Sequence, residues 1–305
     1  MLGGVHRLSG DVLGGLRRVA GRLKRRMGSP RTPRLAPGVH PLRLPLRLKD
    51  GESWAPSYFF YGRAGASIKL SGHASVLAPG HCPHEPHSHA EEEILMVLDG
   101  EADLLLPEGA GAGGDRVRRL VAGRFVYYPA WFPHSLRARG DSPTNYLMFK
   151  WVARHRGTGT PMGFCEHGSG AVDCGPGAGN GLRCGLVFEG STSHLRKLHC
   201  HVSAIGPGAG YEPHVDEHDV VIVVMEGQIE TLGSRAAPCD VVLCPAGRPH
   251  GIRNAGQTTA RYVVFEFHGP ERPLWRKALD PARARRAAGR LLRAIASRAR
   301  GGKRA

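Results

Sequence analysis

Several features common in proteins are missing from this sequence of 305 residues, and each absence excludes a class of protein. No run of 18 apolar residues occurs, which excludes a helix that spans a membrane. The seven cysteines are odd in number and include no C-x-x-C pair, so neither a disulfide framework nor a structural zinc knot is indicated. The motifs G-x-S-x-G, H-E-x-x-H and G-K-S/T are also missing, which excludes the hydrolase elbow, the zincin site and the P-loop.

Helical periodicity is nearly missing between residues 40 and 270. GAGAGG at 109–114 matches G-x-G-x-x-G, but no helix is expected after it, and a dinucleotide site needs a helix N-terminus. The region instead contains short runs rich in Val, Ile, Leu, Phe and Tyr, and the chain has 43 Gly and 23 Pro to separate them. This pattern is typical of antiparallel strands joined by turns.

The formal net charge of +16 is concentrated at the two ends of the chain. Residues 1–34 hold nine Arg or Lys against one acid, and residues 271–305 hold twelve against two, which leaves −2 for residues 35–270. Both ends show apolar residues every three to four positions, so each is expected to form a basic amphipathic helix. Contact with nucleic acid or an anionic membrane would have to come from these tails, and a solvated or inter-subunit helix is the preferred alternative.

The central region repeats itself. Four blocks align in the same order, with a short insertion in the first copy near residue 110: 57–80 with 185–208, 91–104 with 218–231, 129–137 with 245–253 and 146–151 with 262–267. Ordered matches of this kind indicate a tandem duplication. A glycine-rich stretch near residues 168–181 links the copies.

The first copy contains imidazole and carboxylate side chains at a regular spacing. Two histidines lie two residues apart, so in an extended strand both leave the same face. The pattern is H-x-H, three residues, E, six residues, G, and then G, five residues, P and a later H, at His87, His89, Glu93, Gly100, Gly123, Pro129 and His134. It resembles the two signature motifs of the cupin superfamily, and with the duplication the body of the chain is similar to a bicupin. Trp131 stands where that family usually has a glycine.

The resemblance implies that His87, His89, Glu93 and His134 bind one metal ion. Three imidazoles and one carboxylate form a mixed nitrogen and oxygen shell suited to Fe(II) or Mn(II), and also to Ni(II), Co(II) or Zn(II). A six-coordinate ion would keep two positions for water or substrate, as catalysis requires. For the H-x-H pair alone, the alternative is a solvated acidic loop.

The second copy departs from this pattern. His214 and His250 match the first and last histidines of the first copy, but Asp216 replaces the second histidine and Val220 replaces the glutamate. His218 or Asp219 could substitute for the missing donor, and with His218 the second site is expected to consist of His214, Asp216, His218 and His250. The alternative is a degenerate domain that keeps the fold or a ligand pocket without a tightly bound metal.

Two further residues are candidates for substrate contact. Arg137 follows His134 by three residues and can hold a substrate carboxylate in a bidentate pair, although a surface position is equally compatible. His73 has a counterpart at the same place in the second copy, His201. It either faces the interior near the metal or is an ordinary partly buried histidine, and the second interpretation is preferred.

The expected fold class is all-β: two tandem cupin domains, each a jelly-roll β-barrel, with short basic amphipathic helical tails. The expected boundaries are an N-terminal tail or helix at 1–40, the first cupin domain at 41–165, a Gly-rich link at 166–184, the second cupin domain at 185–270 and a C-terminal helix or tail at 271–305.

The resemblance implies a metal-dependent enzyme of the dioxygenase, decarboxylase or isomerase type, acting on a small polar or carboxylated molecule in the first domain. The residues do not select among these reactions. An alternative from another class is a binding protein, whose domains sense or store a ligand while the basic tails contact nucleic acid, membrane or a partner. Cupin-like domains often pair through strand edges, so a homodimer is expected. Since no secretory segment is recognisable, the protein is expected in the cytoplasm.

Overall fold

The computed structural model describes residues 32–109, 116–153, 159–169 and 181–270. These residues form 19 strands and contain no helix, which confirms the all-β fold class. Within the same part of the chain, nothing therefore offers an apolar helix of membrane-spanning length. Both basic tails that the sequence predicts to be helical lie almost wholly outside the described residues.

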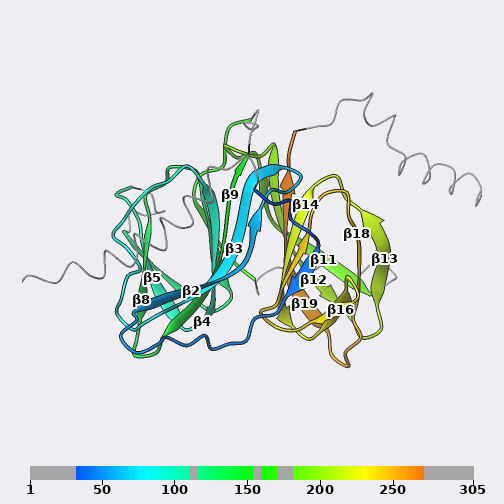
Figure 1. Cartoon of the computed structure of the whole chain (residues 1–305), viewed down its shortest axis with the longest axis horizontal. Coiled ribbons are helices and arrows are strands. Elements are labelled where there is room, and N and C mark those ends of the chain that lie inside the picture. The colour runs from blue at the N-terminus through cyan, green and yellow to red at the C-terminus, as the bar shows by residue number, and fades with distance from the viewer. Residues whose placement is uncertain (1–31, 110–115, 154–158, 170–180, 271–305) are drawn as a thin grey trace, which may run out of the picture. The chain divides into compact units, whose positions relative to one another are not determined.

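The first jelly roll consists of two antiparallel sheets (Figure 1). The large sheet has the order β10-β7-β4-β9-β3-β2, and the small sheet has the order β6-β5-β8. The strands of the large sheet are β2 (Trp54–Gly62), β3 (Ser67–Leu77), β4 (Glu92–Asp99), β7 (Arg124–Tyr128), β9 (Thr144–Ala153) and β10 (Cys165–Gly168). Those of the small sheet are β5 (Glu101–Leu105), β6 (Val117–Val121) and β8 (Ser135–Arg139).

The second jelly roll repeats this arrangement. Its large sheet has the order β1-β17-β14-β19-β12-β11, and its small sheet has the order β13-β18-β15-β16. The strands of the large sheet are β1 (Gly38–His40), β11 (Leu182–Gly190), β12 (Lys197–Ile205), β14 (Asp219–Glu226), β17 (Val241–Cys244) and β19 (Ala260–His268). Those of the small sheet are β13 (Gly210–Val215), β15 (Ile229–Thr231), β16 (Ser234–Ala236) and β18 (Pro249–Arg253).

Alternation along the central strands divides the apolar side chains between two kinds of core. On β4, Leu95 and Val97 point into the first jelly roll and pack with residues of its small sheet. Ile94 and Met96 point to the other face and join a core that both large sheets share. Because both faces are buried, the central strands read as nearly continuous apolar runs. A charged residue on such a strand therefore has a specific place and a specific partner.

The two jelly rolls exchange their first strands. β1, which precedes the first repeat, pairs with β17 and so belongs to the second jelly roll, where its blue ribbon lies among later strands (Figure 1). β10, which precedes the second repeat, pairs with β7 of the first jelly roll. The sequence predicted a tail up to residue 40 and a link from residue 166, but residues 38–40 and 165–168 are strands in the other half's sheet.

A buried acid in each repeat also binds backbone amides of the other repeat. Glu92 and Asp219 occupy equivalent positions at the start of β4 and β14, and both are fully buried. Each accepts two backbone hydrogen bonds, at 2.7 to 3.3 Å, from a loop of the other repeat, and the two loops are equivalent. Ser193 and His194 donate to Glu92, and Gly65 and Ala66 donate to Asp219. Trp151, Tyr127 and Thr192 also donate to Glu92. These contacts fasten the two jelly rolls to each other.

Candidate metal centre

Two of the four predicted donors of the first jelly roll are placed by a backbone pair. The N–H of His87 donates to the carbonyl of His134 at 3.2 Å, and the N–H of His134 donates to the carbonyl of His87 at 3.1 Å. Directly opposite residues in an antiparallel pair project their side chains to the same face. The two ring centroids are accordingly 5.1 Å apart.

The other two predicted donors come from the start of β4 and the turn before it. Glu93 lies on the inner face of β4 and is fully buried. Its Oε2 atom is 3.2 Å from Nε2 of His89 and 3.7 Å from Nε2 of His134. Donor atoms of His87, His89 and His134 all lie within 4.8 Å of one another. The structure thus places the three predicted histidines in one close group, and Glu93 beside two of them.

Hydrogen bonds orient two of these rings for coordination. Nδ1 of His89 lies 3.0 Å from the carbonyl of Glu91, and Nδ1 of His134 lies 2.8 Å from the carbonyl of Phe132. A carbonyl only accepts, so each Nδ1 carries the proton and each Nε2 presents a lone pair to the centre of the cluster. Metal-binding histidines commonly have this arrangement.

The third imidazole, His87, is held in its neutral form. Burial, together with the neighbouring His84, His134 and Lys150, lowers the pKa of His87 to about 4. Its Nδ1 is buried and has no hydrogen-bond partner. At neutral pH this ring is therefore uncharged, and one of its nitrogens is enclosed without a protein partner.

The structure adds a charge that the sequence analysis missed, Lys150. This residue lies directly opposite Glu93, on β9. Its Nζ atom is 2.8 Å from Oε2 of Glu93 and 3.2 Å from Nε2 of His89. Burial alone would raise the pKa of Glu93, but the positive charge of Lys150 and the proximity of His134 and His89 outweigh it and leave this pKa well below its usual range. The signal was present in the sequence, because Lys150 is the one charge in the apolar run YLMFKWV.

Trp131 lies at the edge of this cluster in a conformation that favours glycine. Its φ is 64°, and its N–H donates to the carbonyl of His89 at 2.7 Å. A side chain in the left-handed region is strained by roughly 1 kcal/mol or more. The indole is 66% exposed, so it is not held there by core packing.

Of the two candidates for substrate contact, one points away from the cluster and the other points into the first jelly roll. Arg137 alternates with Leu136 and Ala138, which point into the core, and its own side chain is exposed and faces Asp103 at 3.8 Å. It therefore points away from the cluster, and the structure does not support substrate contact there. His73 is buried and packs against Tyr58, with ring centroids 4.9 Å apart. It lies opposite Met148 on the inner face of the large sheet, and burial, together with the charge of Lys150, lowers the pKa of His73 to about 4.

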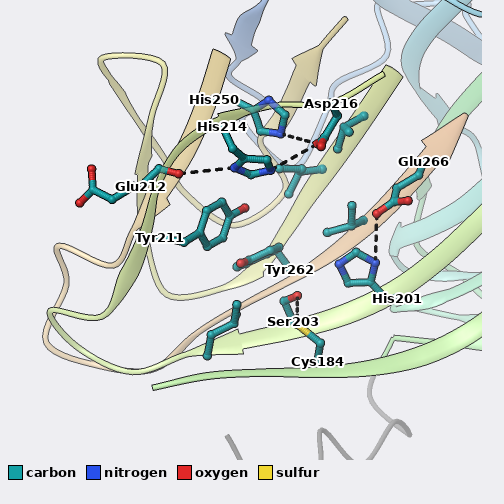
Figure 2. A pocket seen from close by; sticks show the side chains of 14 residues that line it. Cys184, His201, Ser203, Tyr211, Glu212, His214, Asp216, His250, Tyr262 and Glu266 are labelled. Carbon is teal, nitrogen blue, oxygen red and sulfur yellow. Dashed lines mark hydrogen bonds and ion pairs between the residues drawn. The ribbon is translucent and has the colours of Figure 1, made fainter. Parts of the chain in front are cut away.

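In the second jelly roll three of the four predicted donors come together. His214 and His250 are directly opposite one another on β13 and β18. Oδ2 of Asp216 is 3.3 Å from Nε2 of each ring, and Figure 2 shows the three side chains converging. Burial alone would raise the pKa of Asp216, but the neighbouring histidines lower it. Val220, at the position of Glu93, supplies no donor.

The fourth predicted residue, His218, lies between two carboxylates. Its Nε2 atom is 3.9 Å from Oδ2 of Asp216 but 3.3 Å from Oε2 of Glu266. The close donor groups are accordingly His214, Asp216 and His250 on one side and His218, Glu266 and His268 on the other, and Glu266 also forms a close group with His199 and His201. A pocket of about 430 Å³ adjoins both carboxylates, with Tyr211 and Tyr262 in its wall (Figure 2).

The chemistry of the first donor set fits a divalent transition metal. Both oxygens of Glu93 are buried, and neither has a hydrogen-bond partner of good geometry. An ion bound by His87, His89, Glu93 and His134 would satisfy this carboxylate, and imidazole with carboxylate suits the first-row divalent ions. The ammonium group of Lys150 is a competing cation for the same oxygen.

Comparisons with known proteins agree with this architecture. Residues 74–150 match a family described as cupin domain. Among solved structures, a protein from Pseudomonas aeruginosa named for its induction by glyoxylate is 16% identical, with a TM-score of 0.57 over 73% of this chain and 83% of its own. AerE from Microcystis aeruginosa is 16% identical, with a TM-score of 0.53 over 76% and 96%. Protein Ylba from E. coli is 12% identical, with a TM-score of 0.55 over 74% and 88%. At these identities the likeness shows the fold alone. No curated protein matches the chain in sequence.

Proposed function

Since residues 74–150 form a cupin domain, we propose that the chain is a bicupin and that its first jelly roll is a metal-dependent enzyme acting on a small polar or carboxylated molecule. The observation that carries this proposal is the close group of His87, His89 and His134, with Glu93 beside the last two and two Nε2 lone pairs directed inward. Fe(II) or Mn(II) is the proposed ion, and Ni(II), Co(II) or Zn(II) also suit the donors.

When bound, a divalent ion would supply Lewis-acid polarisation of a substrate oxygen. The chain's own residues would bind and orient the substrate. The Lys150 side chain is 22% exposed and carries a positive charge beside the donors, so it is suited to pair with a substrate carboxylate. Trp131, exposed at the edge of the cluster, would cover a ligand there and limit the access of water.

A non-catalytic binding protein is a second candidate, and Lys150 is the observation that favours it. Because the ammonium group already balances the buried charge of Glu93, the site is electrically compensated without an ion. The pocket of about 430 Å³ in the second jelly roll is a suitable size for a small ligand. In this alternative the donors of the first jelly roll form a polar network with a structural role.

Metal analysis of the intact chain separates the two candidates. Protein purified without chelators is assayed for Fe, Mn, Ni, Co and Zn, and oxygen uptake and decarboxylation of small carboxylic acids are followed after Fe(II) or Mn(II) is added. His134→Ala is expected to lose one tight metal equivalent and all metal-dependent turnover. Arg137→Ala, which changes an outward residue of the strand that follows His134, is the matched control and is expected to keep both.

The enzyme proposal fails if the wild-type protein retains no metal and shows no metal-dependent turnover. It also fails if His134→Ala keeps the same tight equivalent as wild type. Full ligand affinity in metal-free protein would support the binding protein instead.

A further inference from the structure

In the second jelly roll the inward-facing carboxylate lies on a different strand from that in the first. Glu93 on β4 faces Lys150 on β9, whereas the equivalent pair in the second jelly roll is Val220 on β14 and Glu266 on β19. Along β19, alternate residues Val263, Phe265 and Phe267 enter the shared core, so Glu266 points to the inner face. The carboxylate missing from the expected position is thus present one strand away.

Two histidines lie close to the same oxygen of the Glu266 carboxylate. Nε2 of His268 is 2.7 Å from Oε2 of Glu266, and Nε2 of His218 is 3.3 Å from it. The two imidazoles are stacked, with centroids 3.9 Å apart and planes inclined by 23°. Nε2 of His218 is buried and has no hydrogen-bond partner. An unsatisfied buried nitrogen next to a carboxylate is the position of a missing partner.

A second pair of histidines, His199 and His201, groups with Glu266 on the side of its other oxygen, and its outer member is fully hydrogen-bonded. Nδ1 of His201 is 3.9 Å from Oε1 of Glu266, and Nε2 of His199 is 3.1 Å from Nδ1 of His201. Nδ1 of His199 bonds to Glu189 at 2.7 Å. Both ring nitrogens of His199 therefore have protein partners. The side of Glu266 with the open nitrogen is the one that His218 and His268 share.

We propose that His218, Glu266 and His268 form a transition-metal site that is separate from the motif positions of both jelly rolls. Two imidazoles and one carboxylate favour a borderline divalent ion such as Zn²⁺, Co²⁺ or Ni²⁺ over Mg²⁺ or Ca²⁺, which prefer oxygen ligands. The three side chains are 13 to 20% exposed, so an ion reaches them from solvent and retains water as further ligands. This site does not depend on the presence of a metal in the first jelly roll.

The test counts Zn²⁺ equivalents in the intact, chelator-stripped chain by competition with a chromogenic chelator, and records the visible absorption of the Co²⁺ form. Glu266→Gln keeps the shape of the side chain and is expected to abolish one equivalent. His268→Ala is expected to abolish the same equivalent and its Co²⁺ absorption. A hundredfold excess of Mg²⁺ is expected to leave the equivalent in place.

Three matched variants locate the site. His199→Ala disrupts the other histidine pair beside Glu266, His250→Ala removes a motif position of the second jelly roll, and His134→Ala removes one of the first jelly roll. Each is expected to keep the equivalent that Glu266→Gln loses. If a variant does not fold, as judged by circular dichroism, His218→Asn replaces it as the second test.

The proposal is overturned if Glu266→Gln and a folded His268→Ala or His218→Asn variant bind as many equivalents as wild type. It is also overturned if His250→Ala or His199→Ala abolishes the equivalent in question, because the ion would then lie at the motif positions or between Glu266 and the pair His199 and His201.

Discussion

Replacing Lys150 with methionine tests whether this lysine competes with a metal for Glu93. Nζ of Lys150 is 2.8 Å from Oε2 of Glu93. An ion coordinated by that oxygen at about 2.1 Å would lie about 5 Å from the ammonium group. Repulsion between a single and a double positive charge at this distance is about 7 kcal/mol at an effective dielectric constant of about 20, and about 2 kcal/mol in bulk water. Even the lower figure corresponds to more than tenfold in affinity.

We expect Lys150→Met to bind Mn²⁺ or Zn²⁺ at the first site at least about tenfold more tightly than wild type, measured by chelator competition. Without metal, the variant leaves Glu93 as an unpaired buried acid, which costs about 3 to 5 kcal/mol. Its thermal midpoint should therefore be low in chelator and should rise with metal far more than that of wild type.

Lys69→Met is the matched control. Lys69 also pairs with a glutamate of this region, Glu91, and is 20% exposed, close to the 22% of Lys150. Lys69 does not touch the four donors, so the metal affinity of the Lys69→Met variant should equal that of wild type. An unchanged or weaker metal affinity in Lys150→Met would refute the argument, because it would mean that the ammonium group and the ion do not compete for the same oxygen.

Three other substitutions test the packing around the sites. Glu92→Ala removes an acceptor with donors in both repeats, and denaturant unfolding should show a loss of about 3 to 5 kcal/mol. Trp131→Gly relieves a left-handed backbone, so it should raise the unfolding free energy by about 1 kcal/mol; a loss of stability would show that the exposed indole contributes more than the strain costs. The pKa of His73 is about 4 in the fold, below the value of about 6.5 in the unfolded chain, so protonation of His73 favours unfolding. The free energy of unfolding is therefore highest above pH 6.5 and falls by up to about 3 kcal/mol as the pH drops to about 4. His73→Phe should make that dependence shallower in unfolding curves measured from pH 7 to 4, and an unchanged slope would count against this origin.

The sequence predicted what depends on local periodicity. Strand alternation and turn residues gave the all-β class, and the spacing of His87, His89 and Glu93 is preserved in space because the turn and the start of β4 are continuous in the chain. The outward direction of the Arg137 side chain could also have been predicted from the sequence. A residue three positions from His134 on a strand points to the opposite side, whereas the expectation considered only its proximity along the chain.

The sequence did not predict features that depend on register between strands. Lys150 and Glu266 occupy equivalent positions in the two repeats, and their opposite charges were visible in the alignment. Their partners are set by which residues lie opposite on β4 and β14, and this requires the sheet itself. The position of His218 between two carboxylates has the same origin. Exchange of the first strands is a long-range pairing, and no short motif encodes it.

Each half contributes an edge strand and a pair of backbone amides to the other half. The two halves therefore contact each other in the same reciprocal way as the subunits of a twofold homodimer, although they belong to one polypeptide. A polypeptide cut between the repeats would yield two fragments, each with an unpaired sheet edge and an exposed apolar face. Such fragments are expected to aggregate or to reassociate rather than fold alone. Any difference in metal content between the halves is therefore accessible only by point substitution within the uncut protein.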